Sequence, residues 1–266
     1  MAECARVANQ VDRALKAHDV HVDFDHQGSV TNDTHIRLHS DVDLLVLPRH
    51  FVFVRAPLVP DRPYAGDPLA ELMEIRRICH ECLDAAYPAA EVDGDGSKAI
   101  SISGGSLQRK VDVVPASWLN TQQYVTSSNK ASRGIRVLDA SVPRLIDNFP
   151  FLHNAWVTAR DQETGGRLRQ LIRLVKSIRS DSDKEPDVSS YHIAGLCFHL
   201  PPHLFVDDPR ASLSAFVTWV IGLLRDASQR ASVMVPNGTE KLFDRIKQSE
   251  LIELLGEATE LLRLAA

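Results

Sequence analysis

The sequence predicts an α+β protein whose first half mixes strands with helices and whose second half is mostly helical. Short runs rich in Val, Leu and Ile, such as "DVDLLVL" and "KAISIS", are typical of strands and lie in the first half. Stretches with apolar residues at helical spacing dominate after residue 160. We therefore expect an α+β lobe over residues 1–136 and a helical lobe over residues 137–266, with a ligand-binding cleft between them.

The individual elements follow from periodicity and from the turn residues that separate them. In the first lobe the spacing predicts helices over residues 3–18 and 68–86, and strands over 40–47 and 51–54 and in "KAISIS" and "LQRKVDVVPA". The polar stretch "NTQQYVTSSNKASRG" predicts loops or irregular structure. In the second lobe helical spacing recurs over residues 163–179, 190–199, 212–228 and 239–264.

The sequence "CHEC" at residues 79–82 contains three possible zinc ligands. A structural zinc site needs a second pair of ligands at a recognisable spacing, and none follows here. Cys79 also fits the pattern of the helix expected over residues 68–86, together with Leu72, Ile75 and Leu83. We therefore favour a helix at this position over a zinc site.

Composition and charge exclude several classes of function. The formal net charge of -5 argues against a general nucleic-acid coat or an anionic membrane surface as the main partner, because both require a basic excess. No apolar run reaches the length of a membrane span, and the N-terminus lacks the pattern of a signal peptide. The 4 cysteines are too few for a secreted disulfide scaffold of this size. We therefore expect a cytoplasmic protein with no membrane partner.

Two aspartates, Asp41 and Asp43, stand at the head of an apolar run with a single valine between them. Alternate side chains of a strand share a face, so the two carboxylates point the same way while Val42 and Leu44 point the other. Like charges at this spacing repel unless a cation lies between them, and hard divalent ions such as Mg²⁺ take carboxylate oxygens. The plainer alternative is that the two aspartates lie at a solvated strand end. A metal site, in contrast, explains why two acids stand so close together.

A third acid and a Gly-Ser pair strengthen the metal-site interpretation. Asp112 is a lone carboxylate among valines, on a strand that can pair beside the first and aim its side chain at Asp41 and Asp43. Three carboxylates can hold two divalent ions, one activating an attacking hydroxyl and one bridging the phosphates of a nucleotide. Gly28 lets backbone amides approach an anion closely, and the hydroxyl of Ser29 can donate to a phosphate oxygen.

These residues resemble the active-site signature of the polymerase-beta-like nucleotidyltransferase superfamily. That signature is a Gly-Ser turn, an Asp-x-Asp on a strand and a third Asp on a later strand, here Gly28-Ser29, Asp41-Val42-Asp43 and Asp112. Within the superfamily the chain is most similar to the branch of oligoadenylate synthetase and cyclic GMP-AMP synthase and to its bacterial relatives, the CD-NTases of antiphage signalling. The resemblance implies the mixed nucleotidyltransferase sheet with flanking helices, a second helical lobe, and an active site in the cleft between the lobes.

Two stretches of the second half carry the narrower resemblance. In "TGGRLRQLIRLVKSIRSD" the residues Arg169, Arg173 and Lys176 share one helical face, which on its own is usually a solvated basic face. The resemblance implies that Lys176 reaches the nucleotide triphosphate. In "VSSYHIAGLCFHL" it implies that Ser190 contacts phosphate and that Tyr191 stacks on a base, where a buried core tyrosine is the plainer alternative.

The implied function is a metal-dependent nucleotidyltransferase that polymerises nucleoside triphosphates into a short cyclic or linear oligonucleotide second messenger in bacterial antiphage signalling. The implied cofactors are two Mg²⁺ or Mn²⁺ ions at Asp41, Asp43 and Asp112. The implied partners are nucleoside triphosphates, ATP or others, and an effector protein that senses the product. Since no zinc-ribbon cysteine cluster is present, we expect no double-stranded DNA activator.

Two other functions stay open at the level of sequence. A nucleotidyltransferase of similar length can transfer a nucleotide to another acceptor, such as an antibiotic, a tRNA end or a protein hydroxyl. The "SSYH" segment and the "RLVK" helix favour oligonucleotide synthesis instead. An inactive nucleotide-binding module is the third possibility, and the presence of all three aspartates argues against it.

Overall fold

The computed structural model describes residues 2–36 and 41–264, and the chain divides into two compact units. Unit 1 comprises Met1–Thr31 and Ser40–Leu152, and unit 2 comprises Asn32–His39 and His153–Ala266. This division lies further along the chain than the boundary at residue 136 that we expected. The reason is that two strands close to that boundary extend the sheet of unit 1, and a strand is stable only beside the strand that completes its hydrogen bonds.

Unit 1 is built on a mixed sheet of eight strands in the described part of the chain. The order β1-β2-β6-β5-β4 forms the main path, and β3 and β7 also pair with β6, while β8 pairs with β7. β2 runs parallel to β6, whereas β1 and β5 are antiparallel to their neighbours. The strands are β1 (Val22–Gln27), β2 (Val42–Pro48), β3 (Phe53–Val54), β4 (Ala90–Asp93), β5 (Ile100–Gly104), β6 (Val111–Asn120), β7 (Gly134–Asp139) and β8 (Arg144–Asn148).

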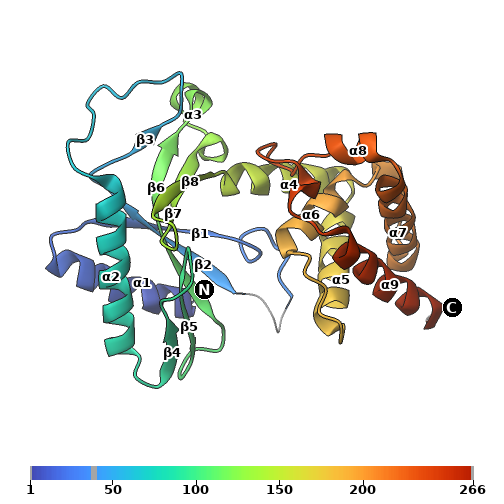
Figure 1. Cartoon of the computed structure of the whole chain (residues 1–266), viewed down its shortest axis with the longest axis horizontal. Helices are drawn as coiled ribbons and strands as arrows, with labels where there is room; N and C mark the ends of the chain where they lie inside the picture. Colours follow the sequence, from blue (N-terminus) through green and yellow to red (C-terminus); the bar gives the residue numbers. More distant parts are fainter. Residues whose placement is uncertain (1, 37–40, 265–266) are drawn as a thin grey trace. The chain divides into compact units, whose positions relative to one another are not determined.

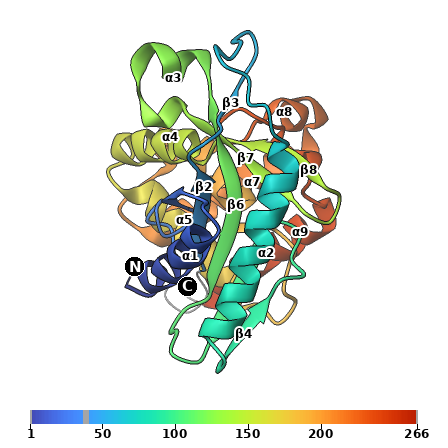
Figure 2. The ribbon, with the colours of Figure 1, turned by 90° about the vertical axis from the view of Figure 1, so that its left-hand side faces the viewer.

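Helices α1 (Ala2–Ala17) and α2 (Pro68–Ala86) pack against each other and against one face of the sheet (Figures 1 and 2). α2 begins where it does because the Asp67 carboxylate accepts hydrogen bonds from two amides of its first turn, and a proline occupies the first helical position. The side chains of Val42, Leu44 and Val46 lie in the core under these helices. Alternation along β2 therefore turns Asp43, Leu45 and Leu47 to the opposite face.

The opposite face of the sheet carries a smaller apolar cluster, which includes Leu45, Val114 and Trp118, with Phe151 packed against it. The stretch expected to be irregular after Trp118 contains a short helix, α3 (Gln122–Ser127), and a 3₁₀ turn, η1 (Lys130–Ser132). Thr121 caps α3 through its side-chain oxygen, and Asn129 caps η1 in the same way. Polar capping residues thus explain why a stretch with no apolar periodicity is still ordered.

Unit 2 is helical, and its core comes from helices that pack around α5 (Figure 1). The apolar stripe of α5 is buried as its spacing predicts, through Leu168, Leu171, Ile172, Val175 and Ile178. The helices are α4 (Pro150–Glu163), whose first three residues still belong to unit 1, α5 (Arg167–Asp181), α6 (Ser190–His199), α7 (Pro209–Arg225), α8 (Ala227–Ser232) and α9 (Gln248–Leu264), with 3₁₀ turns η2 (Pro202–Leu204) and η3 (Leu242–Asp244).

The α+β class and most of the predicted elements are confirmed, but the helix expected over residues 239–264 begins only at Gln248. The helices expected over residues 68–86 and 190–199 have those bounds as α2 and α6. The helix expected from residue 163 begins only at Arg167, because Gly165 and Gly166 adopt positive φ angles of 62° and 84° and separate α4 from α5. Sequence patterns missed α4, two of whose three buried residues are polar, and the strands β1, β4, β7 and β8. No helix of the described residues has the length and apolar character that a membrane crossing requires.

Candidate active site

The aspartates predicted to act together meet at one end of β2 and β6. Asp43 and Asp112 are Cα partners on these adjacent parallel strands, and Asp41 directly precedes β2. The line continues across the sheet, because Gln27 of β1 is the partner of Asp43 and Ser101 of β5 is the partner of Asp112. The pairing of the two strands, which sequence could only suggest, therefore places the second and third carboxylates side by side.

Gly28 packs directly on Asp43. It follows β1 with a positive φ of 85°, and a Cβ atom at this position would overlap Oδ2 of Asp43 and lie 3.3 Å from its Cγ. Glycine is therefore favoured both by the backbone conformation and by the close approach. Ser29 follows in the same turn, which the hydroxyl of Thr31 closes by donating to the Gly28 carbonyl at 2.9 Å.

The electrostatics of this cluster favour a bound cation. Burial, together with the charges of Asp112 and Asp41, raises the pKa of Asp43 to about 7. The hydroxyl of Ser101 donates to Oδ1 of Asp112 at 2.5 Å. The ammonium of Lys110 lies 3.5 Å from Oδ2 of Asp41 and 3.3 Å from Oδ1 of Asp112. The pKa of one carboxyl is raised, and the other two carboxylates share one lysine. The cluster therefore carries more negative charge than its neighbouring side chains neutralise.

Within the described residues no group of three or more His, Cys, Asp and Glu side chains is drawn together as a metal centre. Asp41 is 47% exposed and is held by Lys110, whereas Asp112 is 16% exposed. The structure thus puts the predicted acids at the same end of two strands without closing them into a coordination shell.

In unit 2, three cations of α5 donate to three successive backbone carbonyls. Nε of Arg169 lies 2.8 Å from the carbonyl oxygen of Asn32, Nη1 of Arg173 lies 2.6 Å from that of Asp33, and Nζ of Lys176 lies 2.8 Å from that of Thr34. The face that would usually be solvated therefore binds the segment that follows the Gly28-Ser29 turn in the sequence. Burial lowers the pKa of Lys176, which is 3% exposed, to about 8.

Ser190 and Tyr191 lie in the first turn of α6. The helix is capped by Ser189, whose hydroxyl oxygen accepts from the amide of His192, so the side chain of Ser190 is not used as the cap. The Tyr191 ring lies 5.0 Å from the ring of His153, and its hydroxyl donates to Oδ1 of Asn237 at 3.2 Å. Tyr191 is half-buried against the core of unit 2. It therefore packs in part like a core residue and still leaves part of its surface open to a ligand.

Sequence reasoning missed Ser101, Lys110 and His153. Lys110 and Ser101 belong to no sequence motif, because each becomes part of the site only through the strand register. The position of Lys110, two residues before Asp112, is the one feature of the sequence that could have indicated its role. His153 is buried, and this burial lowers its pKa to about 4, so it is a neutral neighbour of Tyr191. Nothing in the local sequence indicated that contact.

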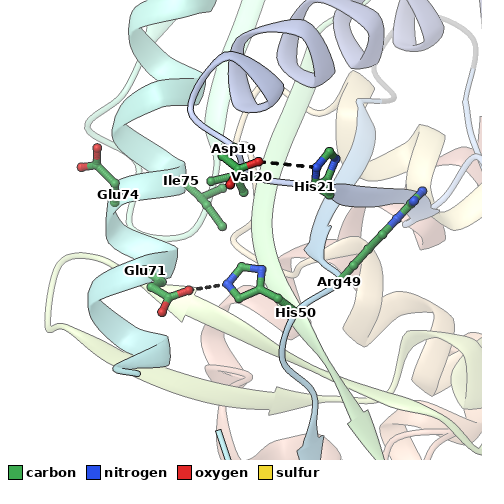
Figure 3. Close-up of a pocket in the computed structure, with 8 residues that line it drawn as sticks. All are labelled: Asp19, Val20, His21, Arg49, His50, Glu71, Glu74 and Ile75. Carbon is green, nitrogen blue, oxygen red and sulfur yellow. Dashed lines mark hydrogen bonds and ion pairs between the residues drawn. The ribbon is translucent and has the colours of Figure 1, made fainter. Parts of the chain in front are cut away.

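A pocket of about 610 Å³ in unit 1 lies at the other end of β2 from the aspartates, where Arg49 and His50 follow the strand (Figure 3). Its polar side chains largely satisfy one another, since His50 contacts Glu71 at 2.5 Å and His21 lies 3.8 Å from Asp19. None of the residues predicted to bind nucleotide or metal lines this pocket. It does not belong to the candidate active site.

Comparisons with known proteins agree with the geometry. The family model of the cGAS/DncV-like nucleotidyltransferase C-terminal helical domain matches residues 155–262. The chain is 35% identical over 272 residues to the cyclic dinucleotide synthase CdnE of Yersinia aleksiciae, and the match covers 97% of this chain and 71% of that protein.

Solved structures share the fold. A STING-associated CdnE c-di-GMP synthase from Flavobacteriaceae sp. matches 97% of this chain and 80% of its own with a TM-score of 0.76 and 20% identity. The CdnE cyclic dinucleotide synthase of Elizabethkingia meningoseptica, solved with GTP and Apcpp, matches 97% of this chain and 92% of its own with a TM-score of 0.70 and 21% identity. At these identities the structures establish the fold, and the relative from Yersinia establishes the family. The chain belongs to the CD-NTase family of nucleotidyltransferases.

Proposed function

We propose that this protein joins two nucleoside triphosphates into a cyclic dinucleotide second messenger, with Asp41, Asp43 and Asp112 as ligands of two Mg²⁺ or Mn²⁺ ions. The observation that carries the proposal is the register of β2 and β6, which makes Asp43 and Asp112 partners beside a glycine turn that touches Asp43. Carboxylates on adjacent strands beside a glycine turn suit phosphoryl chemistry.

The donor set fits divalent metal ions of this kind. All three side chains offer hard carboxylate oxygens, which Mg²⁺ and Mn²⁺ prefer. The pKa of Asp43 is raised because its carboxylate is buried and faces two other negative charges. A bound cation would offset this repulsion. Bound ions would supply Lewis-acid activation of the attacking hydroxyl and neutralise charge on the triphosphate.

The reaction is the attack of a ribose hydroxyl oxygen on the α-phosphorus of a nucleoside triphosphate, with pyrophosphate as the leaving group. A second attack of the same kind closes the ring and releases the second pyrophosphate. We assign to Gly28 and Ser29 the binding of phosphate oxygens, because a turn with positive φ exposes its amides and Ser29 adds a hydroxyl donor. Asp41, Asp43 and Asp112 hold the negative charge that keeps the cations in place.

We assign the base and triphosphate contacts to unit 2. Ser190 lies at the N-terminal turn of α6, where unpaired amides favour an anion, so its hydroxyl suits a phosphate oxygen. The hydroxyl of Tyr191 is fixed by Asn237, and its ring lies 5.0 Å from the ring of His153 and 5.9 Å from that of His192, so the ring is held in place for a base to stack on it. Lys176 bonds the carbonyl of Thr34 here, and a role at the triphosphate requires it to exchange that partner.

The product class rests on the similarity to the Yersinia protein, whose name is that of a cyclic dinucleotide synthase. A small diffusible product implies a receiver, so we propose an effector protein that binds it, in antiphage signalling by a bacterial cell. The bases used are left to experiment.

The test is direct synthesis with the purified full chain. Each of the four ribonucleoside triphosphates, labelled on the α-phosphate and alone or in pairs, is incubated with Mg²⁺ or Mn²⁺. The expected result is a product that keeps all of its label after phosphatase treatment and is cleaved by a nuclease specific for phosphodiester bonds, because a linear dinucleotide would release the label of its terminal α-phosphate. Label that stays phosphatase-sensitive in every mixture contradicts ring closure. Transfer that appears only when a cell extract is added shows an acceptor other than a nucleotide.

A further inference from the structure

Lys110 is the cation of the aspartate cluster. It directly precedes β6, and its carbonyl accepts from the amide of Val42 at 3.2 Å, which fixes its backbone beside the start of β2. Its Nζ lies 3.5 Å from Oδ2 of Asp41 and 3.3 Å from Oδ1 of Asp112. Across the residues that the structure describes, no other Lys, Arg or His is within ion-pair distance of the three aspartates.

The position of this ammonium follows from electrostatics. Asp41, Asp43 and Asp112 repel one another, and a single positive charge between two of them offsets part of that repulsion. Asp43 has no ion pair of its own among the described residues, so Lys110 pairs with two carboxylates and offsets the charge of the third only in part, across a longer distance. A monovalent cation on a side chain is therefore an incomplete substitute for divalent ions at this site.

The side chain of Lys110 is also free to leave. It is 39% exposed, and a lysine carries a compact charge on a flexible four-carbon stem. Exposed ion pairs of this kind are weak, so an ion of twice the charge can replace it at small cost. Its backbone stays in place while the ammonium moves, because the bond from Val42 does not involve the side chain.

We infer that Lys110 is an internal counter-ion that holds Asp41 and Asp112 in the metal-free protein and competes with divalent metal ions for these carboxylates. It is a positioning residue: it keeps the acids at the ends of their strands before the metal binds, and it sets the metal concentration at which the site fills. This inference rests on the proposed metal-binding role of the three aspartates.

The test measures metal binding without nucleotide, so that no activity is needed. Mn²⁺ is titrated calorimetrically into the full-length protein, and melting temperatures are recorded in chelator and in saturating Mn²⁺. Lys110→Met removes the ammonium and keeps the stem, and Lys110→Arg keeps a positive charge. Arg109→Met is the matched control, because it removes the same charge one residue away from a side chain that makes no ion pair with the aspartates within the described residues.

We expect Lys110→Met to bind Mn²⁺ roughly three- to tenfold more tightly than the parent, as the loss of two weak competing ion pairs implies. Its melting temperature should be lower than that of the parent in chelator and equal to it in saturating Mn²⁺. Lys110→Arg should return both quantities toward the parent, and Arg109→Met should change Mn²⁺ affinity by less than twofold. Equal affinities for Lys110→Met and Arg109→Met overturn the inference.

Asp112→Asn distinguishes this failure from a failure of the proposed function. If the parent binds Mn²⁺ and Asp112→Asn does not, the metal site stands and the comparison of Lys110→Met with Arg109→Met decides the role of Lys110. If the parent shows no Mn²⁺ binding, or if Asp112→Asn binds as well as the parent, the metal site itself is wrong and the counter-ion inference is overturned together with it.

Discussion

Gly28 lies so close to Asp43 that a Cβ atom at this position would overlap the carboxylate of Asp43. The two residues are joined by the register of β1 and β2, in which Gln27 is the partner of Asp43, so the turn that leaves β1 passes directly over the carboxylate. The turn assigned to phosphate binding and the carboxylate assigned to metal binding are thus in contact, and a change in one moves the other.

Gly28→Ala is expected to abolish turnover, because the added methyl group must displace the Asp43 carboxylate. Gly104→Ala is the matched control: Gly104 also has a positive φ, 77°, in unit 1, but a Cβ atom there meets nothing within 4 Å. Both variants should lose about 1 kcal/mol of stability from backbone strain. Synthesis assays and thermal melts on the pair check this, and equal losses of activity would mean that strain, and not contact with Asp43, is what matters.

Asp43→Asn is expected to change how the metal-free protein responds to pH. The folded-state pKa of Asp43, about 7, lies above its ordinary value of 3.8, so the folded state binds the proton more tightly and stability falls as the pH rises between these values. Asparagine has no such proton. The variant should therefore gain stability relative to the parent from pH 4 to pH 7, with a constant difference above that, and it should be inactive throughout.

Denaturant unfolding in chelator at pH 4.5, 6 and 8 measures this difference. Asp147→Asn is a control, since Asp147 of β8 is paired with Arg136 of β7 and makes no ion pair or hydrogen bond with the three aspartates among the described residues. A parent and an Asp43→Asn variant that keep the same difference at all three pH values would contradict the raised pKa.

Lys176→Ala is expected to weaken the binding of nucleoside triphosphates far more than that of nucleosides if its ammonium reaches phosphate. Its bond to the Thr34 carbonyl offers another route, in which the segment after the Gly28-Ser29 turn loses an anchor and both ligands weaken alike. Arg173→Ala, which removes the neighbouring bond to Asp33, reports that second route alone. Affinities of ATP and adenosine for the parent and both variants separate the two roles.

The pH dependence of Lys176 has the opposite sign. Its folded-state pKa of about 8 lies below its ordinary value of 10.5, so the unfolded state binds the proton more tightly and stability rises with pH between these values. The parent should therefore gain stability relative to Lys176→Met from pH 8 to pH 10. Unfolding curves of the parent and of Lys176→Met at those two pH values check it. If the difference in stability between them is the same at both pH values, the ammonium is solvated.

Tyr191→Ala is expected to lose roughly 1 to 3 kcal/mol of nucleotide affinity if the ring stacks on a base, while Tyr191→Phe keeps most of it. The phenylalanine variant should instead lose about 1 kcal/mol of stability, because it deletes the bond to Asn237. Tyr124→Ala in unit 1, which removes a ring from beneath the Arg133 guanidinium, is a control for the loss of a half-buried aromatic ring. Unchanged affinity in Tyr191→Ala would leave the ring a core residue.

Sequence alone determined the features that depend on short stretches of chain. The bounds of α2 follow from its own cap, proline and apolar stripe, and the apolar stripe of α5 is buried as its spacing predicts. The three aspartates could be selected because a charged residue inside an apolar strand is conspicuous without any partner. Family membership followed from the same local motifs.

Tertiary structure decided everything that joins distant residues. Lys176 and Thr34 are 142 residues apart, and only the packing of unit 2 shows that the basic face of α5 binds backbone carbonyls. Lys110 and Ser101 entered the site through the register of β6 with its neighbours, and Gly28 acquired its contact with Asp43 through the register of β1 with β2. The physical reason is the same in each case: periodicity fixes which face a side chain takes, whereas strand register and helix packing, which sum many weak contacts along the chain, fix what that face meets.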